Sequence, residues 1–229
     1  MKTAIITGGS SGLGKCIKDA LKSWHGQWEV LDWSLNTGVD VRNSANIETA
    51  ALAAPDKVDV LVNYAGVNGI AYLPQLKEEE WDTLMDTNAK GIFLCTQALV
   101  EKLRGGTVVN IVSNASHVPM TSSLAYNASK GAAAIMTKQL NRELKKTHNI
   151  TVFGISPNKL KDTGMSEYID KKVCELRGWT PEQARAYQVA ALPAGEETDP
   201  KMLAEFVAFL LSKKERHKYL AGCDIPYGA

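Results

Sequence analysis

Short apolar runs alternate with longer amphipathic segments along this chain. The apolar runs, rich in β-branched or aromatic residues, occupy residues 2–7, 28–32, 58–62, 107–112 and 150–155. Runs of this length and composition are typical of buried strands. The segments between them place apolar side chains at helical spacing, and they occupy residues 15–24, 43–54, 76–104, 122–146 and 199–212. Strands that alternate with helices predict an α/β protein with a parallel sheet.

We expect one doubly wound, Rossmann-type domain spanning residues 1–229, with a parallel sheet of about seven strands and helices on both faces. The last strand is expected within residues 219–229, where Pro226 fits an edge strand or its end. Residues 159–195 are predicted to form a helical lid over the ligand site. Thr180 and Pro181 begin a helix in this lid, since Thr is a favoured N-cap and Pro is favoured at the first helical position.

Composition narrows the class of protein. The chain has 229 residues, 45% of them hydrophobic and 22% charged, which is ordinary for a globular protein. Its formal charge of +1 gives no indication of a nucleic-acid partner. No apolar run approaches the length of a membrane span and no signal peptide is apparent, so we expect a cytoplasmic location. The four cysteines are far apart and have no metal-binding spacing, so no metal is expected.

A glycine-rich turn follows the first predicted strand and precedes a predicted helix. Thr7, Gly8, Gly12 and Gly14 occupy fixed positions in this turn. Glycines allow a ligand to approach the backbone closely, and the helix N-terminus offers free N–H groups to a pyrophosphate. The turn therefore predicts a dinucleotide site, with a ligand-free glycine turn as the alternative.

The pair Tyr126 and Lys130 is the strongest candidate for catalysis. The two residues lie at i and i+4 of a predicted helix, so both side chains reach the same patch. A nearby ammonium favours the phenolate, and we expect it to lower the Tyr126 pKa towards neutrality. Tyr168 and Lys172 have the same spacing, but thirteen residues before Tyr126 stands Ser113 at a strand end, whereas Ile155 precedes Tyr168 by the same interval.

With these motifs the chain resembles the short-chain dehydrogenase/reductase (SDR) family over essentially its whole length. The turn has the T-G-x-x-x-G-x-G form of that family, and Asn88 begins an N-x-x-G motif. The resemblance implies that Ser113 binds the substrate oxygen, Tyr126 transfers the proton, Lys130 assists Tyr126 and binds the nicotinamide ribose, and Asn88 supports a proton relay. His117 lies near Ser113, and we leave it outside the predicted catalytic set.

The resemblance also implies a set of cofactor-binding positions. These are Thr7, Gly8, Ser10, Ser11, Gly12, Leu13, Gly14, Asp32, Asp40, Val41, Asn63, Ala65, Gly66, Tyr126, Lys130, Pro157, Asn158, Leu160 and Thr163. Asp32 ends the second predicted strand, where a carboxylate accepts from ribose hydroxyls and repels the 2′-phosphate of NADP. This favours NAD as the cofactor, while NADP stays open because Trp33 is the alternative occupant of the discriminating position.

Three residues at the expected cofactor site depart from the family pattern. Tyr64 replaces the second Asn of N-N-A-G, and Asn158 replaces the Gly of Pro-Gly. Asn tolerates positive φ better than other non-Gly residues, so the turn is expected to survive. Asp162 stands where the family has Thr, so either the loop shifts by one residue to present Thr163, or the cofactor is held more weakly.

Among functions, we favour an NAD-dependent oxidoreductase that transfers a hydride between a nicotinamide cofactor and a small-molecule alcohol or carbonyl substrate. A reductase of 3-oxoacyl thioesters that uses NADP(H) is a second hypothesis. A non-catalytic dinucleotide-binding sensor or scaffold is a third, supported only by the altered loop at Asn158 and Asp162. A homodimer or homotetramer is expected by resemblance.

Overall fold

Six parallel strands form one sheet in the computed structural model of the chain, which describes residues 1–24 and 27–228. In sheet order the strands are β2 (Trp28–Trp33), β1 (Lys2–Thr7), β3 (Val60–Asn63), β4 (Thr107–Ile111), β5 (Thr151–Pro157) and β6 (Asp224–Tyr227). The order reverses direction at β1 and β3, and ligands of doubly wound sheets bind beyond the strand ends at such a switch point. Both the fold class and the parallel sheet are confirmed.

The prediction of about seven strands is wrong for the described residues, which contain six. After β2, residues 34–42 form only a 3₁₀ turn at Leu35–Thr37 and further turns, with no additional strand. A parallel crossover needs roughly a dozen residues or more, so this connection is too short to supply a helix and a strand. Consequently β2 forms one edge of the sheet, next to β1 alone.

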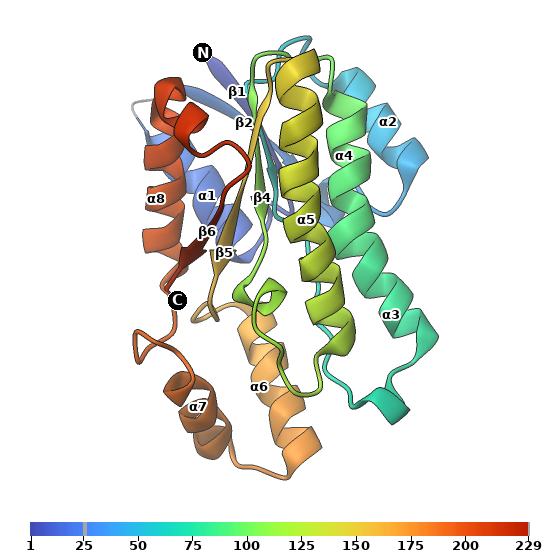
Figure 1. Cartoon of the computed structure of the whole chain (residues 1–229), viewed down its shortest axis with the longest axis vertical. Coiled ribbons are helices and arrows are strands. Elements are labelled where there is room, and N and C mark those ends of the chain that lie inside the picture. The colour runs from blue at the N-terminus through green and yellow to red at the C-terminus, as the bar shows by residue number, and fades with distance from the viewer. Residues whose placement is uncertain (25–26, 229) are drawn as a thin grey trace.

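Helices cover both faces of the sheet (Figure 1). α1 (Gly12–Ser23) and α8 (Pro200–Ser212) lie on one face, where Ile17, Leu203 and Val207 are fully buried against the strands. On the other face lie α2 (Ser44–Ala53), α4 (Gly91–Leu99) and α5 (Leu124–Thr147). The inner strands β1, β3, β4 and β5 are rich in apolar residues because both of their faces are buried.

The long amphipathic run that begins at Leu76 forms three successive helical pieces. α3 (Glu78–Met85) continues into a π-helical turn at Asp86–Lys90 and then into α4. A π turn inserted in an α-helix disrupts the regular hydrogen-bond ladder and is frequent at functional sites. Asn88, fully buried, lies in this turn.

Two helices of the predicted lid extend beyond the carboxyl ends of the strands (Figure 1). They are α6 (Gly164–Arg177) and α7 (Pro181–Ala190), and α7 begins as expected, with Thr180 as its N-cap in a capping box with Gln183. Pro226 lies in the edge strand β6, also as expected. Ala229, the last residue of the predicted closing segment, lies outside the described residues. Within residues 1–24 and 27–228, no helix is both long and apolar enough to cross a membrane.

Candidate active site

A cavity of about 550 Å³ opens between the carboxyl ends of the strands and the helices α6 and α7. Ser113, Tyr126 and Lys130 all line it, although they come from the end of β4 and from α5. Gly66, which follows β3, lines the same cavity. Three of the four residues that the sequence predicts for catalysis are thus brought to one surface.

Tyr126 and Lys130 are buried on the first turns of α5, with 7% and 5% of their surfaces exposed. The Lys130 ammonium donates a hydrogen bond to the carbonyl oxygen of Ile111 at 3.1 Å. It lies 5.9 Å from the centroid of the Tyr126 ring. The end of β4 therefore fixes the lysine beside the tyrosine.

The pKa values of the pair differ from the expectation. Burial raises the pKa of Tyr126, and this effect exceeds the opposing hydrogen bond with the Ser113 hydroxyl. Burial also lowers the pKa of Lys130 to about 8. The predicted lowering of the Tyr126 pKa by Lys130 is therefore wrong for these side chains by themselves, because desolvation disfavours the charged form of both groups.

Asn88 lies behind Lys130 and orders the segment that follows β3. Its side-chain amide donates to the carbonyl oxygen of Val67 and to Ser129 Oγ, both at 2.9 Å, while its Oδ1 accepts from the N–H of Val67 at 2.8 Å. A Cβ added to Gly66 would lie 3.1 Å from Asn88 Oδ1 and 3.7 Å from Lys130 Nζ. A side chain at this position would therefore press on Asn88, while Lys130 would be at an ordinary contact distance.

The glycine-rich turn is tied to β3 through Thr7. The Thr7 hydroxyl oxygen accepts hydrogen bonds from the backbone N–H groups of Tyr64 and Ala65, each at 3.0 Å. Gly8 and Gly12 adopt left-handed backbone conformations with φ of 71° and 50°, which glycine accommodates without strain. The turn thus has the conformation that a dinucleotide-binding loop needs.

Tyr64 is packed against this turn. Its hydroxyl oxygen accepts a hydrogen bond from the N–H of Leu13 at 3.2 Å, at the start of α1. A Cβ added to Gly14 would lie 2.4 Å from the Tyr64 ring, and one added to Gly12 would lie 2.6 Å from its hydroxyl. The small size of both glycines is therefore needed for Tyr64 itself.

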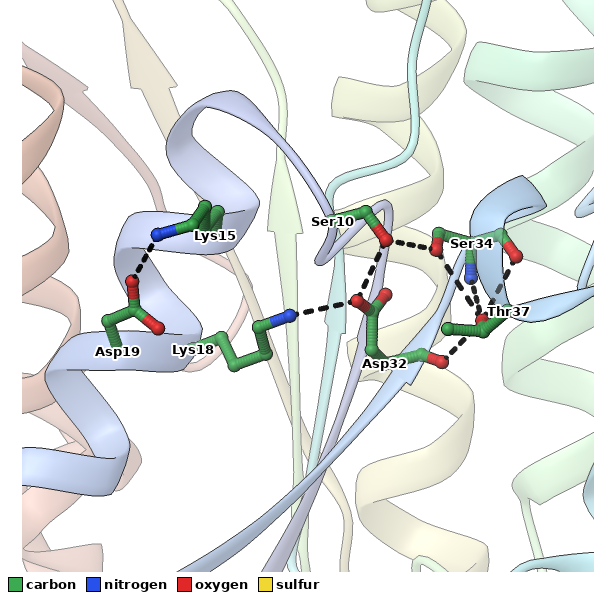
Figure 2. A network of polar contacts seen from close by, with 7 residues as sticks. All are labelled: Ser10, Lys15, Lys18, Asp19, Asp32, Ser34 and Thr37. Atoms are coloured by element: carbon green, nitrogen blue, oxygen red, sulfur yellow. Dashed lines mark hydrogen bonds and ion pairs between the residues drawn. The ribbon is translucent and has the colours of Figure 1, made fainter.

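Asp32, at the end of β2, is the centre of a polar network (Figure 2). Its Oδ2 accepts from the Ser10 hydroxyl and from the Lys18 ammonium, both at 2.9 Å, and Ser10 also bonds Ser34. Its other oxygen, Oδ1, is buried and has no hydrogen-bond partner among the described residues. An unpaired buried carboxylate oxygen is rare, and it suits donors supplied by a ligand.

The loop after β5 places Thr163 and Asp162 in different surroundings. Thr163 is buried, lines the cavity and caps α6 by accepting from the N–H of Ser166 at 3.2 Å. Asp162 is exposed and has φ of 53°, a conformation that Asp tolerates. Thr163, and not Asp162, is therefore the residue that this loop presents to the cavity. Asn158 lines the cavity, and its φ is not positive. The expected need for a residue that tolerates positive φ therefore does not arise at this position.

Several predicted cofactor positions lie away from the cavity. The Asn63 side chain donates to Asn110 at 2.9 Å inside the sheet, and Asp40 forms an ion pair with Arg42 at 2.7 Å. Val41 is buried against Gly91. In contrast, Pro157 and Leu160 do line the cavity.

The sequence interpretation missed Asp224. This side chain is 3% exposed, and its carboxylate accepts from the Ser156 hydroxyl at 2.8 and 2.9 Å and from His117 Nε2 at 2.8 Å. It therefore connects β6 and β5 to the loop that follows Ser113. An acidic residue within the apolar closing strand was the available signal. His117 forms part of this network instead of lining the cavity.

The residues present fit a dinucleotide. Asp32 presents an unpaired buried oxygen, Gly9 lies close enough that a Cβ would come within 2.9 Å of that oxygen, and the turn is left-handed at Gly8 and Gly12. Ser11, exposed at the start of α1, makes no side-chain capping bond. The Leu13 N–H, at the same helix start, donates to the Tyr64 hydroxyl.

Comparison with known proteins agrees with these features. A family model described as short chain dehydrogenase matches residues 34–173. The chain is 30% identical over 232 residues to a 3-oxoacyl-acyl-carrier-protein reductase of Vibrio cholerae, covering 92% of this chain and 90% of the relative. It is 31% identical over 233 residues to the NAD-dependent glycerol dehydrogenase of Listeria innocua, covering 92% and 87%.

Among solved structures, a variant of actinorhodin polyketide ketoreductase with NADPH has a TM-score of 0.87 and 26% identity, over 98% of this chain and 95% of that one. Family match, relatives and fold agree along nearly the whole length. The chain therefore belongs to the short-chain dehydrogenase family, whose members are oxidoreductases that use NAD(H) or NADP(H).

Proposed function

We propose that this protein reduces a small-molecule carbonyl group, or oxidises the corresponding alcohol, with Tyr126 as the general acid and base. The observation that carries the proposal is the shared cavity of Ser113, Tyr126 and Lys130 beside the glycine-rich turn. The raised pKa of Tyr126 keeps the phenol protonated at neutral pH, and a protonated phenol suits the reductive direction.

In that direction each residue has one role. A bound nicotinamide cofactor supplies the hydride. The Ser113 hydroxyl donates a hydrogen bond to the carbonyl oxygen and aligns it with Tyr126. As the carbonyl carbon gains the hydride, Tyr126 transfers its proton to the oxygen, which yields the alcohol. Lys130 then stabilises the phenolate, and Asn88 supports its reprotonation from solvent.

For the cofactor itself we propose a preference for NAD(H). Support comes from the unpaired Oδ1 of Asp32, because a free carboxylate oxygen accepts from ribose hydroxyls and repels a 2′-phosphate. Ser10, Ser11, Leu13, Ala65, Gly66 and Thr163 are the proposed contacts along the rest of the dinucleotide. A related ketoreductase binds NADPH, so the dissociation constants of NADH and NADPH have to be compared to test this preference.

The test is the substitution Tyr126→Phe, with Tyr168→Phe as the matched control from the second Y-x-x-x-K pair. Turnover of a panel of ketones is expected to disappear in the first variant and to persist in the second. Binding of NADH, followed by its fluorescence, is expected to be nearly unchanged in both. Full activity of Tyr126→Phe would refute the assigned role.

Two other functions follow from specific observations. The similarity to the Vibrio reductase supports a 3-oxoacyl thioester substrate, which turnover of acetoacetyl thioesters with NADPH would identify. The contact between Tyr64 and Leu13, at the proposed cofactor site, is compatible with a non-catalytic sensor. Dinucleotide binding without oxidoreduction of any alcohol or ketone in a broad panel would favour the sensor. Two expectations remain predictions: a cytoplasmic location, which rests on the hydrophobic pattern of the sequence, and a homodimer or homotetramer, which rests on the family resemblance.

A further inference from the structure

One face of α6 forms a wall of the active-site cavity. Met165, Ile169, Val173 and Arg177 all line it, and their spacing of four residues places them in a single stripe along the helix. Three apolar side chains are followed by one cation. At 1.5 Å per residue the stripe spans about 18 Å, so Arg177 lies at the end of the wall farthest from the sheet.

Arg177 is held in place by two aromatic rings. Its guanidinium carbon lies 4.7 Å from the ring centroids of both Trp179 and Tyr187. The two rings contact each other edge to face at 5.1 Å. Stacking of this kind orients the planar guanidinium while leaving its N–H groups free to donate.

No carboxylate of the described residues forms an ion pair with Arg177, whereas other cations at the cavity have partners. Lys159 pairs with Asp170 and, at 2.9 Å, with Glu197, so its charge is compensated. Lys130 donates to Ile111 and belongs to the proposed catalytic set. Neither Asp nor Glu occurs among the described residues that line the cavity. The wall therefore carries uncompensated positive charge at its outer end.

Apolar side chains also line the cavity on two other segments. Val118, Pro119 and Met120 come from the loop after β4, and Leu192 and Pro193 from the segment after α7. A ligand that fills this space contacts hydrocarbon along most of its length and a guanidinium only at its tip. An anionic tip would replace the water bound to Arg177 with a charge-assisted, bidentate hydrogen bond.

We propose that Arg177 is a substrate-specificity residue, and that the substrate combines a carbonyl or alcohol, an extended apolar body and a terminal oxyanion, either carboxylate or phosphate. This inference rests on the proposed function for its reacting end, but the anion site is independent of catalysis. Arg177 ends the stripe on α6 and does not belong to the set of Ser113, Tyr126 and Lys130, so it acts on binding.

Binding tests the anion site without any turnover. Calorimetric titration of the wild-type protein with decanoate, decyl phosphate and decanol is expected to give tighter binding of one or both anions than of the neutral alcohol. Arg177→Met should weaken the anions about tenfold or more and leave decanol nearly unchanged, because a charge-assisted hydrogen bond is lost. The preferred anion identifies carboxylate or phosphate as the natural group.

Controls separate this effect from a general loss of structure. Lys171→Met removes an exposed cation from the same helix and should change none of the three affinities. Arg177→Lys keeps the charge without the planar fork and should recover part of the anion affinity. Equal weakening of decanol and decanoate in Arg177→Met, or equal wild-type affinity for both, would overturn the proposal.

Kinetics then connect the site to catalysis. For a long-chain keto acid and its methyl ester, Arg177→Met should raise KM for the acid about tenfold and change kcat little, whereas the ester should be unaffected. If the anion site binds decanoate but neither ketone is reduced by the wild-type enzyme, the proposed function fails while the anion site stands.

Discussion

The hydroxyl oxygen of Tyr64 accepts a hydrogen bond from the N–H of Leu13 at 3.2 Å. This N–H belongs to the first turn of α1, where the backbone N–H groups have no acceptor within the helix. A dinucleotide-binding helix presents these N–H groups to a pyrophosphate. Burial raises the pKa of Tyr64, so the group remains a neutral phenol. Tyr64 thus satisfies a donor that the predicted ligand would also use.

Tyr64→Phe is expected to strengthen NADH binding about fivefold. The variant keeps the ring that packs under the glycine turn but removes the competing acceptor, and one neutral hydrogen bond is worth about 1 kcal/mol. The same variant should lower the free energy of unfolding by a similar amount, because the Leu13 N–H loses its partner. Fluorescence titration and urea unfolding measure the two effects.

Tyr219→Phe serves as the control, since Tyr219 is 75% exposed and lies on the segment before β6. Tyr219→Phe should alter neither the affinity for NADH nor the free energy of unfolding. Weaker NADH binding in Tyr64→Phe would mean instead that the hydroxyl contacts the cofactor directly and contributes to its binding.

Cofactor preference is expected to depend on Lys18 as well as on Asp32. The two form an ion pair at 2.9 Å with side-chain exposures of 20% and 12%, so solvent screens it only partly. Lys18→Met leaves the Asp32 carboxylate uncompensated and should weaken NADPH binding more than NADH binding. Asp32→Asn leaves Lys18 free for a 2′-phosphate and should shift the ratio of affinities about tenfold towards NADPH.

A matched control lies on the same helix, as Figure 2 shows. Lys15 pairs with Asp19 at 2.8 Å, both more than half exposed, and Lys15→Met should leave both affinities unchanged. The idea would be abandoned if Lys18→Met and Lys15→Met gave the same ratio of NADH to NADPH dissociation constants.

Local patterns predicted most of the fold and indicated the candidate catalytic residues. The apolar runs gave the strands within two residues, and the spacing between Ser113 and Tyr126 placed both at one cavity. Thr180 and Pro181 began α7 as expected, because capping depends only on neighbouring residues. Such features are encoded within a few positions of the chain.

The remaining features depend on contacts between distant segments. Tyr64 lies about fifty positions from Leu13, and Asp224 lies farther still from His117, so no local pattern indicates either contact. The pKa of Tyr126 was predicted wrongly for a related reason. Helical spacing indicated the proximity of Lys130, but the burial of both groups came from the assembled sheet and helices.

The stability of the protein is expected to vary with pH through Lys130. Its pKa falls from 10.5 in the unfolded chain to about 8 in the folded protein, so the unfolded state binds more protons between these values. Stability therefore rises with pH across this interval. Relative to Lys130→Met, which does not titrate, the wild-type protein should gain about 3 kcal/mol between pH 7 and pH 11.

Urea unfolding of both proteins over this pH range measures the difference between their free energies of unfolding. The other lysines are the same in both proteins, so their contributions cancel. Below pH 8 the ammonium is desolvated and Lys130→Met is expected to be the more stable of the two, apart from the lost hydrogen bond to Ile111. A difference that stayed constant with pH would show that Lys130 titrates at its ordinary pKa.

Asp224→Asn should destabilise the protein and disturb the active-site loop together. The buried carboxylate accepts from both the Ser156 hydroxyl and His117 Nε2, and an amide replaces one of its acceptor oxygens with a donor. Loss of one such bond, with a buried polar group left unsatisfied, costs about 1–3 kcal/mol. Because His117 lies in the loop that follows Ser113, turnover should fall as well.

The exposed Asp56 provides the control, since Asp56→Asn removes the same charge and should change the free energy of unfolding by less than about 0.5 kcal/mol. His117→Asn separates the two roles of Asp224. It breaks only the bond to the loop, so it should reduce kcat with less loss of stability than Asp224→Asn. If His117→Asn left kcat intact, the Asp224 network would hold β5 to β6 without supporting Ser113.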